Sequence, residues 1–224
     1  IVTTMMGGME LTEEDLNIVK NTDGVEAVIP NVYKAVLIKS EDKTKTMNLY
    51  GIDIRNSLDI YQNDMGMTVE NGRWPVPGKR EIIAGSLVPK DIFPGLKIGD
   101  TVRIKGKQFE VVGALKSMGN KQDDMMIGID MNLYRNITGE RKGAPQAIAK
   151  ISEGYSVDQV AKSIKNNLEE SAKRRAGQES GSVYSVLTSE ALGSIVGNIM
   201  GIIQVVIFAF GSIAVLVGGI GIMN

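Results

Sequence analysis

The chain has 224 residues, and its 25 Lys and Arg against 26 Asp and Glu give a formal charge of −1. This balance lacks the strong positive field that nucleic-acid-binding proteins use, so we expect no nucleic-acid partner. Cysteine and histidine are both absent, which excludes disulfides, Cys/His zinc sites, Ser-His-Asp triads and Cys-His dyads within this chain.

The N-terminal part predicts a helix followed by a β-hairpin. Thr12 is a natural helix N-cap, and the three acidic residues after it lie where the helix dipole favours negative charge. Alternating apolar residues flank a charged turn at residues 40–45, as expected of paired strands. The expected segments are a strand or the continuation of an upstream element at residues 1–8, a helix at 11–20, an extended piece at 25–30, and strands at 32–38 and 46–52.

The middle of the chain predicts a β-rich unit. It opens with residues 71–78, where Gly and Pro surround the only Trp, and we interpret this stretch as a hinge or connector. Alternation on both sides of Gly106 predicts a half-buried hairpin. The expected segments are a strand at residues 81–84, a short helix at 86–92, the hairpin at 96–113, a strand at 125–129 and a short helix at 131–138.

The third part has a β-α-β order. We predict a strand at residues 147–151, an amphipathic helix at 156–171 with Ser156 as its cap, and a final strand at 183–187. The apolar stripe of that helix consists of Val157, Val160, Ala161, Ile164 and Leu168.

These elements predict an α+β fold with two lobes. Residues 1–65 and 145–190 would form one split β-α-β lobe, and residues 66–144 a β-rich lobe inserted into it.

The C-terminal stretch predicts a membrane helix. No residue from Ala191 to Asn224 is charged, a run well past the ~18 apolar residues that indicate a membrane span. A helix over the whole run would be roughly 50 Å long, against a hydrocarbon core of about 30 Å. We therefore expect residues 191–204, which contain Asn198 and Gln204, to form a stalk and residues 205–224 to cross the bilayer.

The glycines of this stretch indicate helix packing. Gly193, Gly197 and Gly201 recur every four residues, which places them on one helical face and allows a second helix to approach closely. A second contact or a bend is expected at Gly218, Gly219 and Gly221. Because the sequence begins at Ile1 and stops directly after this helix, it is expected to be a fragment of a larger permease-like protein.

Several motifs together carry a family resemblance. They are Gly72-Arg73-Trp74, the strand from Glu81 to Gly85, the hairpin pattern from Leu96 to Gly113, and the terminal Leu216-Val-Gly-Gly-Ile-Gly-Ile-Met-Asn224. In this order the chain resembles the MacB/FtsX-like permeases of ABC transporters over nearly its whole length. It would correspond to their extracytoplasmic core domain and the start of the second membrane helix. The resemblance implies that residues 1–190, with both lobes, lie outside the cytoplasm.

The resemblance implies mechanical coupling rather than catalysis. An ABC ATPase subunit or domain would bind ATP and drive two permease copies together, as a homodimer or heterodimer, and the stalk would transmit that motion to the extracytoplasmic lobes. The chain itself lacks the Gly-x-x-x-x-Gly-Lys-Ser/Thr motif of a P-loop. We therefore predict no enzyme activity, no cofactor and no metal in this chain, and a position in the cell membrane.

A different class of function also matches the sequence: a membrane-anchored binding or adhesion module that needs no ATPase. A membrane-tethered hydrolase is disfavoured, because Ser40-Glu-Asp-Lys43 resembles a Ser-x-x-Lys motif but lies in a charged turn. Asp123-Asp124 is interpreted as a solvated loop, and Asn136-Ile-Thr138 as a possible glycosylation sequon. Met118, Met125 and Met126 are assigned either to the core or to an adaptable apolar contact.

Overall fold

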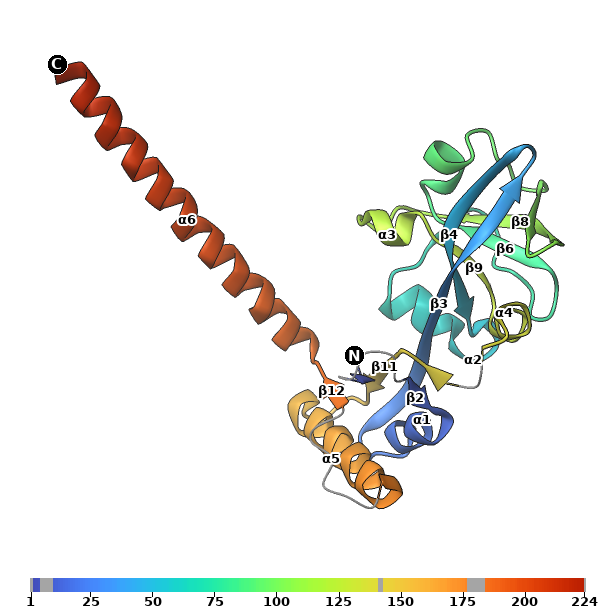
Figure 1. The fold of residues 1–224 in the computed structure, drawn as a ribbon. Helices are drawn as coiled ribbons and strands as arrows, with labels where there is room; N and C mark the ends of the chain where they lie inside the picture. Colours follow the sequence, from blue (N-terminus) through green and yellow to red (C-terminus); the bar gives the residue numbers. More distant parts are fainter. Residues whose placement is uncertain (1, 5–9, 141–142, 177–183, 224) are drawn as a thin grey trace.

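A computed structural model describes residues 2–4, 10–140, 143–176 and 184–223. It consists of two lobes joined by a long strand, with a single helix projecting from the lower lobe (Figure 1). We call the lobe that holds α1 (Glu13–Lys20), α5 (Val157–Ala176) and β12 (Tyr184–Val186) the first lobe. The lobe that holds β6 (Glu81–Ala84), β8 (Lys107–Leu115) and β9 (Ile127–Asp130) is the second lobe.

The first lobe packs two helices against one end of the sheet. Leu11, Val19 and the buried face of α5 form its core, so the predicted stripe of that helix is largely confirmed. Val160, Ile164 and Leu168 are at most 4% exposed, whereas Val157 is 50% exposed because it lies in the first turn of the helix. The elements are β1 Val2–Thr4, β2 Leu11–Thr12, α1 Glu13–Lys20, β10 Gly143–Ala144, β11 Gln146–Ile151, α5 Val157–Ala176 and β12 Tyr184–Val186.

Helix α1 begins where the sequence predicts. The Thr12 hydroxyl accepts a hydrogen bond from the Asp15 backbone N–H at 3.1 Å, and the Asp15 carboxylate accepts one from the Thr12 N–H at 2.9 Å. This reciprocal capping box satisfies two backbone donors at the helix start.

Strand β3, Val25–Ser40, connects the two lobes (Figure 1). It pairs with β11 in the first lobe over residues 25–31 and with β4 in the second lobe over residues 32–40. The extended piece at residues 25–30 and the strand at 32–38, which were expected as separate segments, are therefore one strand. Proline holds its neighbourhood extended, and the strand continues through it by changing partner just beyond it.

The second lobe is the β-rich unit expected from the sequence. The two predicted hairpins are confirmed as β3–β4 and β7–β8. The expected short helix at residues 86–92 is one π-helical turn. Its elements are β4 Lys43–Ile52, α2 Ile54–Asp59, η1 Ile60–Asp64, β5 Val69–Gly72, β6 Glu81–Ala84, η2 Val88–Ile92, β7 Thr101–Ile104, β8 Lys107–Leu115, α3 Lys121–Asp124, β9 Ile127–Asp130 and α4 Met131–Thr138.

Two apolar clusters fill the second lobe, one on each side of its sheet. The larger is built around Phe109, Ile127 and Tyr134, and the other around Ile52, Ile83 and Met126. Strand β4 contributes to both clusters, although it precedes residue 66. The predicted lobe boundaries at residues 65/66 and 144/145 stay a prediction.

Candidate functional site

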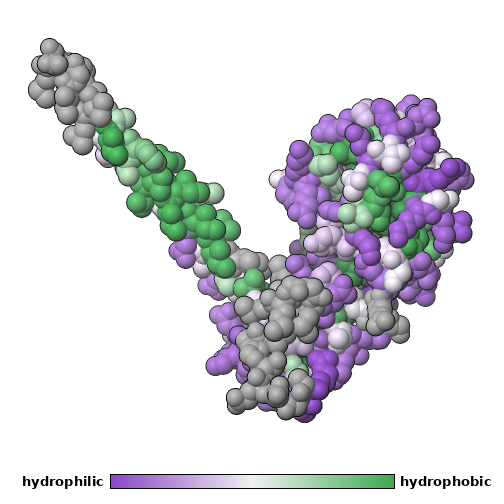
Figure 2. Space-filling view, viewed as in Figure 1, coloured by the Kyte–Doolittle hydropathy of each residue, from purple (hydrophilic) through white to green (hydrophobic). Residues whose placement is uncertain are grey.

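The C-terminal helix α6, Ser189–Met223, is the first part of the candidate site. It is continuous through the predicted stalk and the predicted membrane segment, and it projects clear of both lobes (Figure 1). Figure 2 shows its hydrophobic side chains in green along the described length. Phe208 and Phe210, for example, are 77% and 70% exposed. Segment Ser189–Ala214 is long and apolar enough to cross a membrane and has no buried part, which is the pattern of a lipid-embedded helix.

One face of α6 has room for another helix. A Cβ atom built at Gly193, Gly197 or Gly201 meets no other atom within 4 Å outside the helix backbone. Gly211 is equally open and lies five helical turns after Gly193, so it continues the same face. Sequence reasoning did not include Gly211, although its 18-residue spacing was the signal that identifies it. The face is available to a partner helix, and its use remains a prediction.

The remaining predicted glycines lie farther along α6. Gly218, Gly219 and Gly221 all fall inside its helical backbone. Their surroundings lie outside the described part of the chain, so the predicted second contact stays a prediction.

The root of α6 is attached to the first lobe through β12. Only Leu187 and Thr188 separate the strand from the helix, and the Thr188 hydroxyl accepts a hydrogen bond from the Ala191 N–H at 3.1 Å. This is an N-cap contact, which fixes the first turn of the helix. A movement of α6 therefore acts on β12 through a very short link.

A polar cluster holds β12 to both helices of the first lobe. Asp15 of α1 is 2% exposed, and it receives hydrogen bonds from Arg175 of α5 at 2.5 Å and from the Tyr184 hydroxyl of β12 at 3.0 Å. Arg175 also donates to the Tyr184 oxygen at 3.0 Å. Burial, followed by the nearby Asp15 charge, raises the pKa of Tyr184, which keeps the hydroxyl protonated and able to donate.

The sheet connects β12, at the root of α6, to the second lobe. Strand β1 pairs with β12 on one side and with β11 on the other, and β11 pairs with β3. Because β3 is a single strand shared by both lobes, an uninterrupted series of backbone hydrogen bonds runs from the root of α6 to the second lobe. Sequence reasoning could not identify this series, since it depends on pairing between segments far apart in the chain.

The stretch at residues 71–78, predicted to be a hinge or connector, connects β5 to β6 and is held by side-chain contacts. Arg73 contacts both carboxylate oxygens of Glu81, at 2.7 and 2.9 Å, and the Val76 N–H donates to the same carboxylate at 2.8 Å. Glu81 is 5% exposed. The hydrogen bond from Arg73 is the main cause that lowers the pKa of Glu81 to about 2.

The other motifs have structural positions. Ser40 and Lys43 pair across the two-residue turn of the β3–β4 hairpin, as the turn interpretation expects. Asp124 is not solvated: it is 5% exposed and accepts hydrogen bonds from the Ser117 hydroxyl and the Met118 N–H, both at 2.7 Å. Among the described residues, no group of three acidic side chains is placed to hold a metal ion.

The structure also places the predicted glycosylation sequon and two of the methionines singled out in the sequence. Asn136 is exposed on α4, but the Thr138 hydroxyl is buried and donates to the Tyr134 carbonyl at 2.8 Å. Met126 is buried in the core, and Met118 packs against the same cluster.

These features define a class of protein, namely a two-lobed α+β domain whose last described strand leads into a candidate membrane helix. The chain belongs to the MacB-like periplasmic core domain family, whose model matches residues 1–167. This places residues 1–190 outside the cytoplasm, in accord with the prediction.

Curated relatives are permeases of ABC transporters. An ABC transporter permease of Methanocaldococcus jannaschii is 30% identical over 95% of this chain and 52% of its own length. The permease YknZ of Bacillus subtilis is 24% identical over 95% of this chain and 53% of its own length. The macrolide export ATP-binding/permease protein MacB of Aggregatibacter actinomycetemcomitans is 23% identical over 94% of this chain and 32% of its own length. The chain thus spans about half the length, or less, of these relatives.

Solved structures share the fold. The extracellular domain of YknZ, described as a noncanonic ABC-type transporter, superposes with a TM-score of 0.61 at 22% identity, over 84% of this chain and 98% of the YknZ domain. The periplasmic region of MacB from Actinobacillus actinomycetemcomitans gives 0.67 at 18% identity, over 88% of this chain and 91% of that region. The α+β two-lobed fold predicted from the sequence is confirmed by this likeness.

Proposed function

We propose that this chain is the extracytoplasmic coupling part of an ABC transporter permease subunit. In this proposal, an ABC ATPase subunit or domain hydrolyses ATP in the cytoplasm, and α6 transmits the resulting motion to the two lobes. The chain itself carries out no catalysis. The single observation that supports the proposal best is the continuity of α6, which reaches from the predicted bilayer segment to the two-residue link at β12.

The stiffness of this connection is what coupling requires. A helix transmits a push or a rotation along its axis only if it is unbroken and if its end is held. Helix α6 satisfies the first condition over about 50 Å. The cluster of Asp15, Arg175 and Tyr184 satisfies the second by holding β12 to α1 and α5.

The relatives support the same proposal and give no support to an anchored module that works without an ATPase. Those compared are permeases of ABC transporters, and one of them is an ATP-binding/permease protein. We extend this to two partners for the present chain: an ABC ATPase, and a second permease copy that packs against the Gly193, Gly197 and Gly201 face. The lipid bilayer surrounds the C-terminal part of α6.

A flexible insertion tests the coupling. Four glycines inserted between Leu187 and Thr188, in the full-length permease reconstituted with its ATPase, should interrupt the link while leaving both lobes folded. Amide hydrogen exchange of β11 and β12 should change on ATP binding in the unmodified protein and stop changing in the variant, with ATP hydrolysis retained. The matched control places the same insertion between Glu41 and Asp42, at the distant hairpin turn. An ATP-dependent exchange change that survives the first insertion refutes the proposal.

A further inference from the structure

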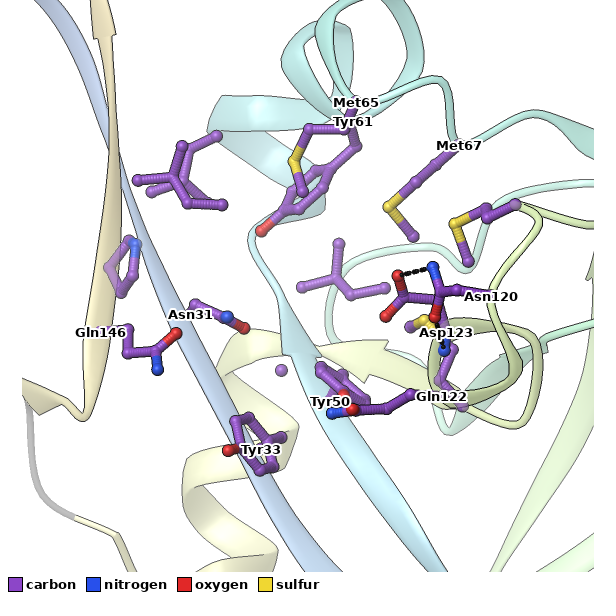
Figure 3. Close-up of a pocket in the computed structure, with 17 residues that line it drawn as sticks. Asn31, Tyr33, Tyr50, Tyr61, Met65, Met67, Asn120, Gln122, Asp123 and Gln146 are labelled. Atoms are coloured by element: carbon purple, nitrogen blue, oxygen red, sulfur yellow. Dashed lines mark hydrogen bonds between the residues drawn. The ribbon is translucent and has the colours of Figure 1, made fainter. Parts of the chain in front are cut away.

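A cavity of about 440 Å³ lies where the two lobes meet (Figure 3). One side is formed by β3 and β11, and the other by β4, η1 and the segment that contains α3. Its volume falls within the range of ~300–1,000 Å³ of small-molecule sites. The cavity is distinct from the root of α6 described above, and it has no part in the coupling proposal.

The deep part of the cavity is apolar and adaptable. Met67 and Met126 line it and are 5% and 4% exposed, and Tyr61 stands beside them at 6%. Met65 and Met118 line the same cavity and are less buried, Met65 being 40% exposed and Met118 half-buried. Methionine side chains are flexible and polarisable, so several of them around one space accommodate apolar groups of different shapes.

The opening of the cavity is polar and carries one charge. Tyr33 and Tyr50 stack there with ring centroids 5.2 Å apart, Gln122 lies beside Tyr50, and Asn120 lies next to Asp123. Asp123 is the one ionisable carboxylate or amine among the lining residues. Its carboxylate accepts a hydrogen bond from the Asn120 amide at 2.6 Å, and the described residues provide no cation within 4 Å of it.

We infer that this cavity binds a cationic amphiphile, that is, a small molecule with an apolar body and a protonated amine. The apolar body lies among the methionines, and the ammonium lies near Asp123 and the exposed face of Tyr33. Two kinds of attraction favour a cation there: the charge of Asp123, and the negative face of an aromatic ring. A carboxylate ligand would instead be repelled by Asp123.

Matched pyrene probes test both parts of the inference. 1-Pyrenebutylamine, 1-pyrenebutanol and 1-pyrenebutyric acid share one apolar body and differ in charge. The chain has a single tryptophan, Trp74, which packs against the same cluster as Met67 and Met126. Energy transfer from Trp74 to pyrene therefore reports binding in the cavity, with the whole chain held in lipid nanodiscs and empty nanodiscs correcting for partition into lipid.

The amine should bind with the lowest Kd and the acid with the highest. Asp123→Asn retains an acceptor oxygen for Asn120 and removes the charge, so it should weaken amine binding about threefold to tenfold and leave alcohol binding unchanged. Tyr33→Ala, at a position that is 38% exposed, should weaken the amine as well. The control Asp42→Asn removes the same charge at the distant hairpin turn and should change neither probe.

Two outcomes overturn the inference. If no probe produces transfer from Trp74 above the empty nanodisc signal, the cavity binds no amphiphile of this size. If the alcohol or the acid binds as tightly as the amine, or if Asp123→Asn leaves the amine unaffected, the selectivity for a cation is wrong.

Discussion

The contact between Arg73 and Glu81 gives the sharpest prediction, because it holds the stretch that the sequence suggested as a hinge. Replacing Glu81 with Gln removes the charge that Arg73 pairs with and leaves the buried side chain nearly the same in size. The expected result is a loss of stability that depends on pH.

The magnitude follows from the pKa. The pKa of Glu81 falls from its ordinary value near 4.5 to about 2 in the folded protein. A difference of one pKa unit corresponds to about 1.4 kcal/mol. The upper limit is therefore about 3 kcal/mol. Because the Arg73 side chain is 51% exposed, solvent screens part of the attraction, and we expect about 2 kcal/mol at pH 7.

The direction with pH follows from the sign of the shift. The folded pKa lies below the unfolded one, so the contribution is fully present above about pH 5 and is lost as the pH falls toward 2. Urea unfolding followed by Trp74 fluorescence reads this directly, since Trp74 is adjacent to Arg73. Between pH 5 and pH 2.5, the unfolding free energy of the unmodified protein should fall by about 2 kcal/mol more than that of Glu81→Gln. The control Glu70→Gln replaces an exposed carboxylate on β5 and should follow the unmodified protein. Equal pH dependence for the unmodified protein and Glu81→Gln would refute the reasoning.

Three further changes test the first lobe and α6. Asp15→Asn leaves Arg175 without its buried charge partner, and we expect urea denaturation to show a loss of about 1–3 kcal/mol in unfolding free energy. A loss below about 0.3 kcal/mol would contradict the role of this cluster. Leu168→Ala, at a position with 0% exposure, should lower the unfolding free energy by about 2–5 kcal/mol, while Val157→Ala on the same helix should lower it by less than about 0.5 kcal/mol. A larger loss for Val157→Ala than for Leu168→Ala in thermal unfolding would contradict the buried face assigned to α5. Gly197→Ile should weaken self-association of α6 about tenfold in a membrane reporter assay, whereas Val206→Phe, nine residues further on and therefore on the opposite face, should not. Equal effects of the two substitutions would contradict the role of the glycine face.

Elements that are fixed by neighbouring residues were predicted correctly from the sequence. The N-cap at Thr12 and the helix at Met131–Thr138 were predicted from neighbouring residues alone, and both are confirmed. The hairpin turns predicted at residues 40–45 and at Gly106 lie at residues 41–42 and 105–106. In each case the interaction that fixes the element lies within a few residues along the chain.

Long-range features were missed because no local pattern encodes them. The extended piece at residues 25–30 and the strand at 32–38 were expected as separate segments, but they form one strand that changes its pairing partner from β11 to β4. The contacts that Glu81, from the next strand, makes with residues 71–78 were not predicted. Strands β4 and β9 pair in parallel across many residues, and the contact of Asp15 with Arg175 and Tyr184 joins opposite ends of the chain.

The central claim, that α6 transmits an ATP-driven motion to the lobes, is tested most directly by a distance measurement. Residues 1–224 contain no cysteine, so Ser194→Cys introduces one spin-label position in the stalk of each permease copy once any cysteine elsewhere in the full-length proteins is replaced by serine. In the full-length permease with its ATPase in nanodiscs, the distance between the two labels should change when ATP is trapped, and should return when nucleotide is released. Identical distance distributions in both states, with the ATPase active, would contradict the account.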